Sequence, residues 1–159
     1  MAARTPGLVA LLLIASFGAG CVSSLTPPEL RKRLLVVGSE VRGLSPQPRV
    51  FAIHASTRME ALTLLADART EPEERLSLAL ARQVAIGKTR RVHFVVGGPF
   101  GELNQQIVTN ALTYHENALP GLVLVLVSPD EPDAELAALA RNRRVQLIHR
   151  PLDVELAAN

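Results

Sequence analysis

The 159-residue sequence predicts an α/β fold: a small three-layer, Rossmann-like domain with a mainly parallel four-stranded sheet, preceded by an N-terminal helix. Three observations predict it. Short, nearly continuous apolar runs are typical of strands covered on both faces. Amphipathic segments with helical spacing lie between these runs, and turns rich in glycine or proline separate the two kinds of segment. Because crossovers between parallel strands are nearly always right-handed, the amphipathic segments are expected to cover the sheet. The sequence leaves the strand order open.

The strands are expected where apolar residues follow one another with little interruption. The run 122–127 is the most continuous one after the N-terminal segment, which favours it as a central strand. The four predicted strands are residues 50–53, 91–96, 122–127 and 145–148.

The helices are expected where a capping residue precedes an apolar stripe. Thr26 and Glu29 form a capping-box pattern with prolines between them, which predicts a first helix that runs toward Gly43. Two further capping patterns, at Thr57 and at Thr70, predict two helices between the first and second strands. The later helices are expected at residues 102–117 and 132–142.

A proline-rich break at residues 45–48 suggests a domain boundary, because each proline keeps the residue before it out of the helical region. The predicted organisation is therefore a signal peptide, a lipidated tether with a short helix and a Pro-rich linker, and an α/β domain. These parts are residues 1–20, 21–48 and 49–159.

The N-terminus has the composition of an export signal. Arg4 precedes the apolar run 8–15, and small residues follow up to Cys21, the single cysteine. This ending resembles the lipobox of bacterial lipoproteins, although Gly18 stands where an aliphatic residue is commonest. The resemblance implies that the signal is removed just before Cys21, that Cys21 is acylated, and that the domain is anchored to a bacterial membrane and faces the periplasm. Val22, which is not an aspartate, implies the outer membrane where two membranes are present.

Two other interpretations of this segment stay open. Residues 7–25 could be an uncleaved membrane anchor, although the run is short and glycines and serines interrupt it. The segment could also be an ordinary signal peptide in which Cys21 has no role.

Composition excludes several function classes. The formal net charge of +2 predicts no basic field for nucleic acid, and the lack of tryptophan argues against a base-stacking platform. With Cys21 acylated, no thiol is left for a disulfide or a nucleophile. No cofactor is expected.

Any ligand site is expected beyond the carboxyl ends of the strands, where open α/β sheets bind their ligands. The turn 97–101 could present backbone N–H groups to an anion, but Glu102 follows where a P-loop has lysine. The histidines at this edge could form a metal or acid–base cluster with an aspartate, although their spacing matches no ligand signature. The candidate ligand-edge residues are His54, Ser56, Gly97, Gly98, Ser128, Asp130 and His149.

No catalytic set is assembled in the sequence, so catalytic residues stay unassigned. We expect a membrane-anchored cell-envelope lipoprotein whose non-catalytic α/β module binds a protein or envelope partner. The alternative is a small envelope hydrolase or ligand-binding enzyme that uses His54, Asp130 and His149 at the carboxyl edge of the sheet.

Overall fold

A computed structural model of the chain describes residues 25–45 and 47–152. The signal segment and Cys21 lie outside the described residues. The fold is a small three-layer α/β domain with a four-stranded parallel sheet, which confirms the predicted fold class.

The sheet is parallel throughout, and its spatial order β1-β2-β3-β4 is the order of the strands in the sequence. All residues of β3 are buried, and β3 lies between β2 and β4, as expected of a central strand. Their bounds are β1 (Arg49–Ala52), β2 (Val92–Gly97), β3 (Leu122–Ser128) and β4 (Gln146–Pro151).

Four of the helices connect consecutive strands. Two of them, with a short 3-10 turn, join β1 to β2, and one helix joins each later pair. The four helices are α2 (Arg58–Thr70), α3 (Arg75–Val84), α4 (Gly101–Thr113) and α5 (Ala134–Asn142), and the 3-10 turn is η1 (Ala85–Lys88).

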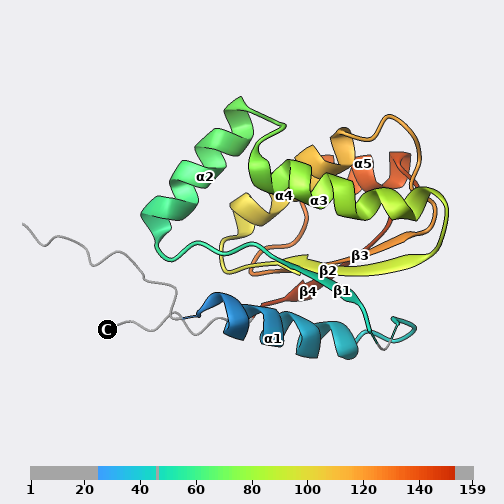
Figure 1. Cartoon of the computed structure of the whole chain (residues 1–159), viewed down its shortest axis with the longest axis horizontal. Coiled ribbons are helices and arrows are strands. Elements are labelled where there is room, and N and C mark those ends of the chain that lie inside the picture. The colour runs from blue at the N-terminus through green and yellow to red at the C-terminus, as the bar shows by residue number, and fades with distance from the viewer. Residues whose placement is uncertain (1–24, 46, 153–159) are drawn as a thin grey trace, which may run out of the picture.

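All four connecting helices cover the same face of the sheet (Figure 1). Every strand pairs with the next one in the sequence, so successive right-handed crossovers all return over one face. The larger core lies between this helical layer and the sheet; Phe94, Ile107 and Leu124 are among its fully buried side chains. A sheet wound in one direction has no point at which the strand order reverses.

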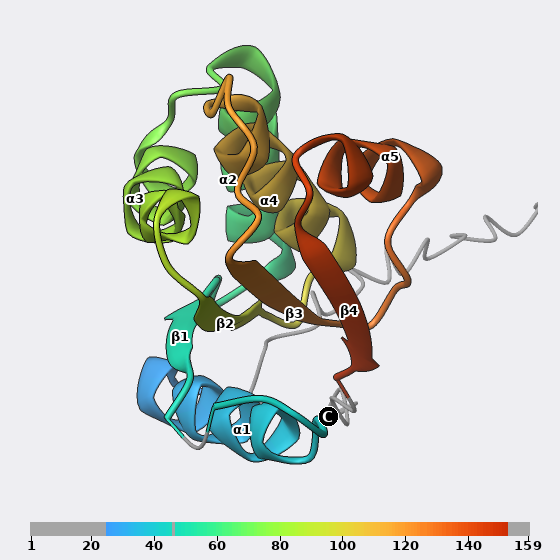
Figure 2. The ribbon, with the colours of Figure 1, turned by 90° about the vertical axis from the view of Figure 1, so that its right-hand side faces the viewer.

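Among the described residues, α1 (Pro27–Ser39) is the one helix that covers the opposite face (Figure 2). Leu30 and Leu34 are fully buried in a second core with Val95 and Val125 of the sheet. At Gly38 the helix approaches so closely that an added Cβ would lie 2.6 Å from the Val95 Cγ2 atom. The helix that precedes the predicted boundary at residues 45–48 is therefore the third layer of the domain.

The first helix starts as its capping pattern predicts. The backbone N–H of Thr26 donates to Glu29 Oε2 across 2.8 Å, and the Thr26 hydroxyl donates to the same oxygen across 2.7 Å. These two hydrogen bonds lower the pKa of Glu29, the side-chain one most, since they favour the ionised carboxylate.

The capping pattern at Thr70 is not used, and the prediction there was wrong. Thr70 is the last residue of α2, and its hydroxyl donates to the Ala66 carbonyl oxygen across 3.0 Å. Glu71 precedes a proline and adopts φ −125° and ψ 87°, outside the helical region. The next helix therefore starts at Arg75, where the Glu74 side chain accepts from the N–H of Ser77.

Candidate functional site

Most candidate residues lie at the carboxyl ends of the strands or after them, at one edge of the sheet, and most have structural partners there. His149 is an exception to the prediction: it lies inside β4, because that strand runs on to Pro151 and does not end at Ile148. His54 follows β1 and directs Nε2 to the Leu25 carbonyl oxygen across 2.9 Å. A carbonyl can only accept, so this ring nitrogen carries the proton. His54 thereby ties the beginning of the described chain to the edge of the sheet.

His149 bonds to a different carbonyl group. Its Nε2 donates to the Ser128 carbonyl oxygen across 3.1 Å, and the same oxygen accepts from the N–H of Leu152 across 3.2 Å. Ser128 itself is fully buried. The two histidines that could have served as a pair therefore each hold a separate segment of backbone.

The glycine-rich turn packs against neighbouring backbone. The N–H of Gly98 donates to the Val127 carbonyl oxygen across 3.3 Å, so it is not presented to an anion. An added Cβ on Gly97 would overlap the Val127 carbonyl oxygen, and one on Gly98 would overlap the Ile53 carbonyl oxygen. Glycine is required here for close packing between strand ends, which weighs against an anion-binding role for this turn.

The remaining candidates are exposed. The backbone N–H of Ser56 donates to Glu60 Oε2 across 2.6 Å, which closes the turn into α2. The Asp130 carboxylate lies against Gly101, the first residue of α4, where an added Cβ would overlap it. A carboxylate at a helix N-terminus interacts favourably with the helix dipole and also repels an anionic ligand.

One buried polar residue at this edge was missed by sequence reasoning. Asn104, in the first turns of α4, donates from Nδ2 to the Gly98 carbonyl oxygen across 2.7 Å and lies 3.4 Å from Ser128 Oγ. Its Oδ1 atom is buried without a hydrogen-bond partner among the described residues. The sequence could have indicated this residue through its helical spacing from Ile107 and Ala111, which places a polar amide on the apolar stripe of the helix.

The structure thus brings Gly98, Asn104 and Ser128 together, with His149 bonded to the backbone of Ser128. None of the hydrogen bonds described above joins His54 or Asp130 to that cluster. Within residues 25–45 and 47–152, no group of three His, Cys, Asp or Glu side chains could hold a metal ion. The arrangement can stiffen the edge, and it presents no nucleophile with an adjacent base.

In the part of the chain that the structure describes, this edge has no crevice of the kind that open α/β sheets use. That crevice forms where neighbouring strands send their connections to opposite faces, and here consecutive connections go to the same face. What remains is a cavity of about 300 Å³ between the start of α2 and the turns that follow β2 and β3. Its walls include Leu62, Phe100 and Pro129.

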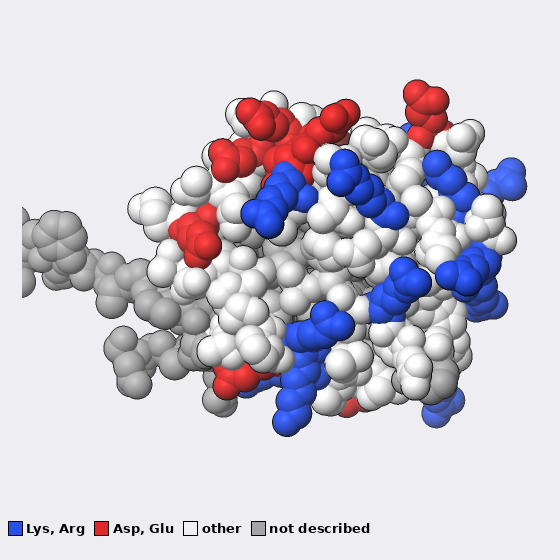
Figure 3. Space-filling model, viewed as in Figure 1, with Lys and Arg blue, Asp and Glu red and all other residues white. Residues whose placement is uncertain are grey.

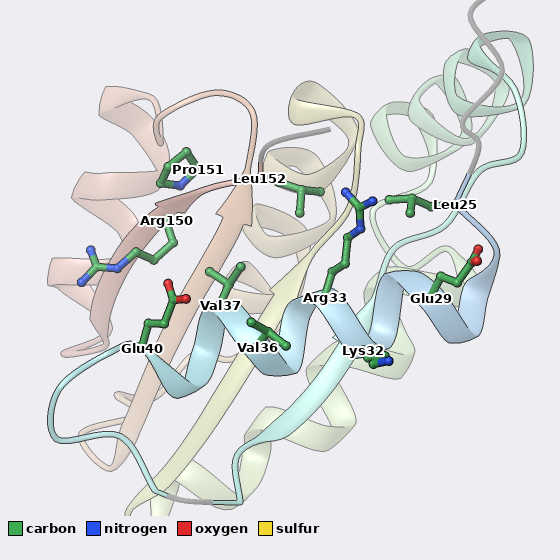
Figure 4. A pocket seen from close by; sticks show the side chains of 10 residues that line it. All are labelled: Leu25, Glu29, Lys32, Arg33, Val36, Val37, Glu40, Arg150, Pro151 and Leu152. Carbon is green, nitrogen blue, oxygen red and sulfur yellow. The ribbon is translucent and has the colours of Figure 1, made fainter. Parts of the chain in front are cut away.

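A larger groove of about 630 Å³ lies on the other side of the sheet, between α1 and the end of β4 (Figure 4). Its apolar wall includes Val36 and Val37, and positively and negatively charged side chains surround the groove. The lining residues are Leu25, Glu29, Lys32, Arg33, Val36, Val37, Glu40, Arg150, Pro151 and Leu152.

Charge is unevenly spread over the surface. On the face in Figure 3, acidic side chains gather over the turn between α2 and α3, whereas Lys and Arg are dispersed over the rest. Glu71, Glu73 and Glu74 occupy that turn in the sequence. The cations on this face do not merge into one continuous patch.

The structure is a singly wound three-layer α/β domain with a groove beside α1. Comparisons of the chain with protein-family models, with curated proteins and with solved structures find no match. In the part of the chain that the structure describes, no helix has the length and apolar character needed to cross a membrane.

Proposed function

We propose that this protein is a membrane-anchored cell-envelope lipoprotein, acylated at Cys21, whose α/β domain binds a protein or envelope partner without catalysing a reaction. The groove between α1 and β4 is the proposed binding surface.

The groove carries this proposal. Helix α1 packs on β1, β2 and β3, so the neighbouring face of β4 stays partly uncovered. Val36 is exposed at the rim, Val37 is half-buried beside it, and Leu152 is a buried residue of the groove wall. An apolar centre with a charged margin is the usual anatomy of a protein–protein interface.

The margin suits a partner of mixed charge. Lys32 and Arg150 supply positive charge, and Glu29 and Glu40 supply negative charge around the same groove. Such a pattern selects a partner by complementary placement of charges and disfavours a partner with a field of one sign.

The alternative, a small envelope hydrolase, has less support. It depended on His54, Asp130 and His149 acting together, and the two histidines donate to the carbonyl groups of Leu25 and Ser128 instead. Those bonds leave Nδ1 of each ring as its acceptor, and none of the hydrogen bonds described above joins either ring to the other or to Asp130.

The anchor is tested by metabolic labelling with a fatty acid. The native chain should incorporate the label and fractionate with membranes, and Cys21→Ser should do neither. Equal labelling of both forms would overturn the proposed anchor.

The groove is tested by photo-crosslinking in intact cells. A photoreactive amino acid at Val36 should give a discrete crosslinked product, and the same group at Tyr114, which is exposed at the C-cap of α4, should not. Arg150→Glu should weaken the Val36 product by reversing one rim charge. Identical product patterns from Val36 and Tyr114 would contradict a binding surface at the groove.

A further inference from the structure

We infer that the domain rests against the membrane with the edge at which the carboxyl ends of its strands lie. The side chains of Met59 and Leu62 enter the lipid headgroup layer there, beside the acyl anchor. This inference rests on the proposed acylation of Cys21 and adds an orientation and a second membrane contact to it.

The first step is the length of the tether. Only residues 22–24 separate Cys21 from Leu25. An extended chain spans at most about 3.6 Å per residue, so the Cα atom of Leu25 lies within about 14 Å of the Cα atom of an acylated Cys21. A tether this short keeps the point of attachment close to the headgroups.

The second step is where that point lies on the domain. Leu25 is buried, and its carbonyl oxygen accepts the hydrogen bond from His54, directly after β1. Leu25 also lines the same groove as Leu152, which follows the end of β4. The chain therefore enters at the carboxyl end of the sheet, and that end must face the membrane.

The third step is the surface that this end exposes. Met59, in the first turn of α2, is 72% exposed, and Leu62, one turn on, is 49% exposed. Leu62 continues into the apolar walls of the 300 Å³ cavity, with Phe100 and Pro129. Exposed apolar side chains that meet a bilayer are stabilised by burial at the boundary of headgroups and acyl chains.

Charge does not drive this contact. Arg58 lines the cavity, but so do Glu102 and Asp130, and Glu60 stands next to Met59 in the sequence. The cation and the carboxylates oppose each other in their effect on anionic lipids. An apolar contact of this kind should therefore persist in neutral vesicles and at high salt.

The test uses the full lipidated chain in phosphatidylcholine vesicles at less than one protein per vesicle. Acylation uses the thiol of Cys21, so Met59→Cys introduces a single free thiol for a fluorophore. Leu62→Cys provides a second labelled position. Tyr114→Cys is the matched control, because Tyr114 is 48% exposed and lies at the far end of α4, toward the amino ends of the strands.

A nitroxide carried on the lipid headgroup should quench the labels at Met59 and Leu62 several-fold more than the label at Tyr114, with and without high salt. Equal quenching at all three positions in a chain that still floats with the vesicles would overturn the membrane contact and leave the anchor intact. Failure of every labelled chain to float, with unacylated Cys21, would overturn the anchor and the contact together.

Discussion

The side-chain amide nitrogen of Asn104 lies 2.7 Å from the carbonyl oxygen of Gly98 and donates a hydrogen bond to it. This bond joins the first turns of α4 to the end of β2, and Ser128 Oγ brings the end of β3 to the same amide. The edge that sequence patterns favour as a ligand site is thus closed by a buried polar cluster.

Asn104→Asp should destabilise the fold by about 2 kcal/mol or more, because a carboxylate oxygen would face the Gly98 carbonyl in a buried site and lose the hydrogen bond. The free energy of unfolding from urea titrations measures the effect. Asn117→Asp, a chemically identical change at an exposed position, should alter it by less than about 0.5 kcal/mol. Equal losses in both variants would contradict a structural role for the buried amide.

Leu34→Ala should cost about 2–5 kcal/mol, since Leu34 is fully buried between α1 and the sheet. Leu35→Ala, at the neighbouring exposed position, should cost less than about 0.5 kcal/mol. Thermal or urea unfolding of the two variants compares an identical truncation on the two sides of one helix. A domain that folds without α1 would tolerate both changes equally.

Gly97→Ala should destabilise the protein by about 1–3 kcal/mol, because the added methyl group would overlap the Val127 carbonyl oxygen and force the strand ends apart. Gly43→Asn serves as the control. Gly43 has a φ of +80° and no neighbouring atom within 4 Å of an added Cβ, and asparagine tolerates that conformation. A larger loss at position 43 than at position 97 would refute the packing argument.

Acidification from pH 7.5 to pH 5 should lower the urea midpoint. Desolvation in the buried site lowers the pKa of His115. The hydrogen bond to the Ala81 carbonyl oxygen raises this pKa, and the charges of Lys88 and Arg143 lower it further. Because the folded-state pKa is depressed, the unfolded chain binds more protons as the pH falls below about 6.5, so stability is lost there.

The variant His115→Gln should reduce that pH dependence, because glutamine does not titrate between pH 7.5 and pH 5. Its side-chain amide can still donate a hydrogen bond to the Ala81 carbonyl oxygen, so the buried acceptor keeps a partner. His93 contributes in the same sense, since desolvation and then the charge of Arg91 lower its pKa. The double variant with His93→Gln should therefore show the flattest profile between pH 7.5 and pH 5. A midpoint that rises on acidification would contradict the direction of both shifts.

Local patterns predicted much of the fold. The apolar run 122–127 became β3 with one more residue, and Thr26 with Glu29 starts α1 as the capping box indicates. Such signals depend on neighbouring residues, so they survive in the folded chain. The pattern at Thr70 failed because it competes with a proline two residues later, whose effect on Glu71 outweighs the cap.

The candidate site was less predictable. His54 follows β1, as predicted, whereas His149 lies inside β4, which is longer than predicted. The ring nitrogens of both are directed at backbone carbonyl groups that no sequence pattern identifies. Asn104 was missed because an amide on an apolar stripe becomes informative only when its partner, the Gly98 carbonyl oxygen, is known. A side chain's role in a polar cluster depends on contacts between segments far apart in the sequence.

By itself the sequence determined the α/β class, the positions of the four strands, and a single cysteine at the end of an export-like segment. These features are set by residue periodicity and by local chemistry. Only the tertiary structure decided the strand order, and with it the absence of a crevice, since crossovers that return to one face cannot open a switch point. It also decided that α1 forms a layer of the domain and that Leu25 enters at the carboxyl edge, because long-range packing and one histidine bond place them there.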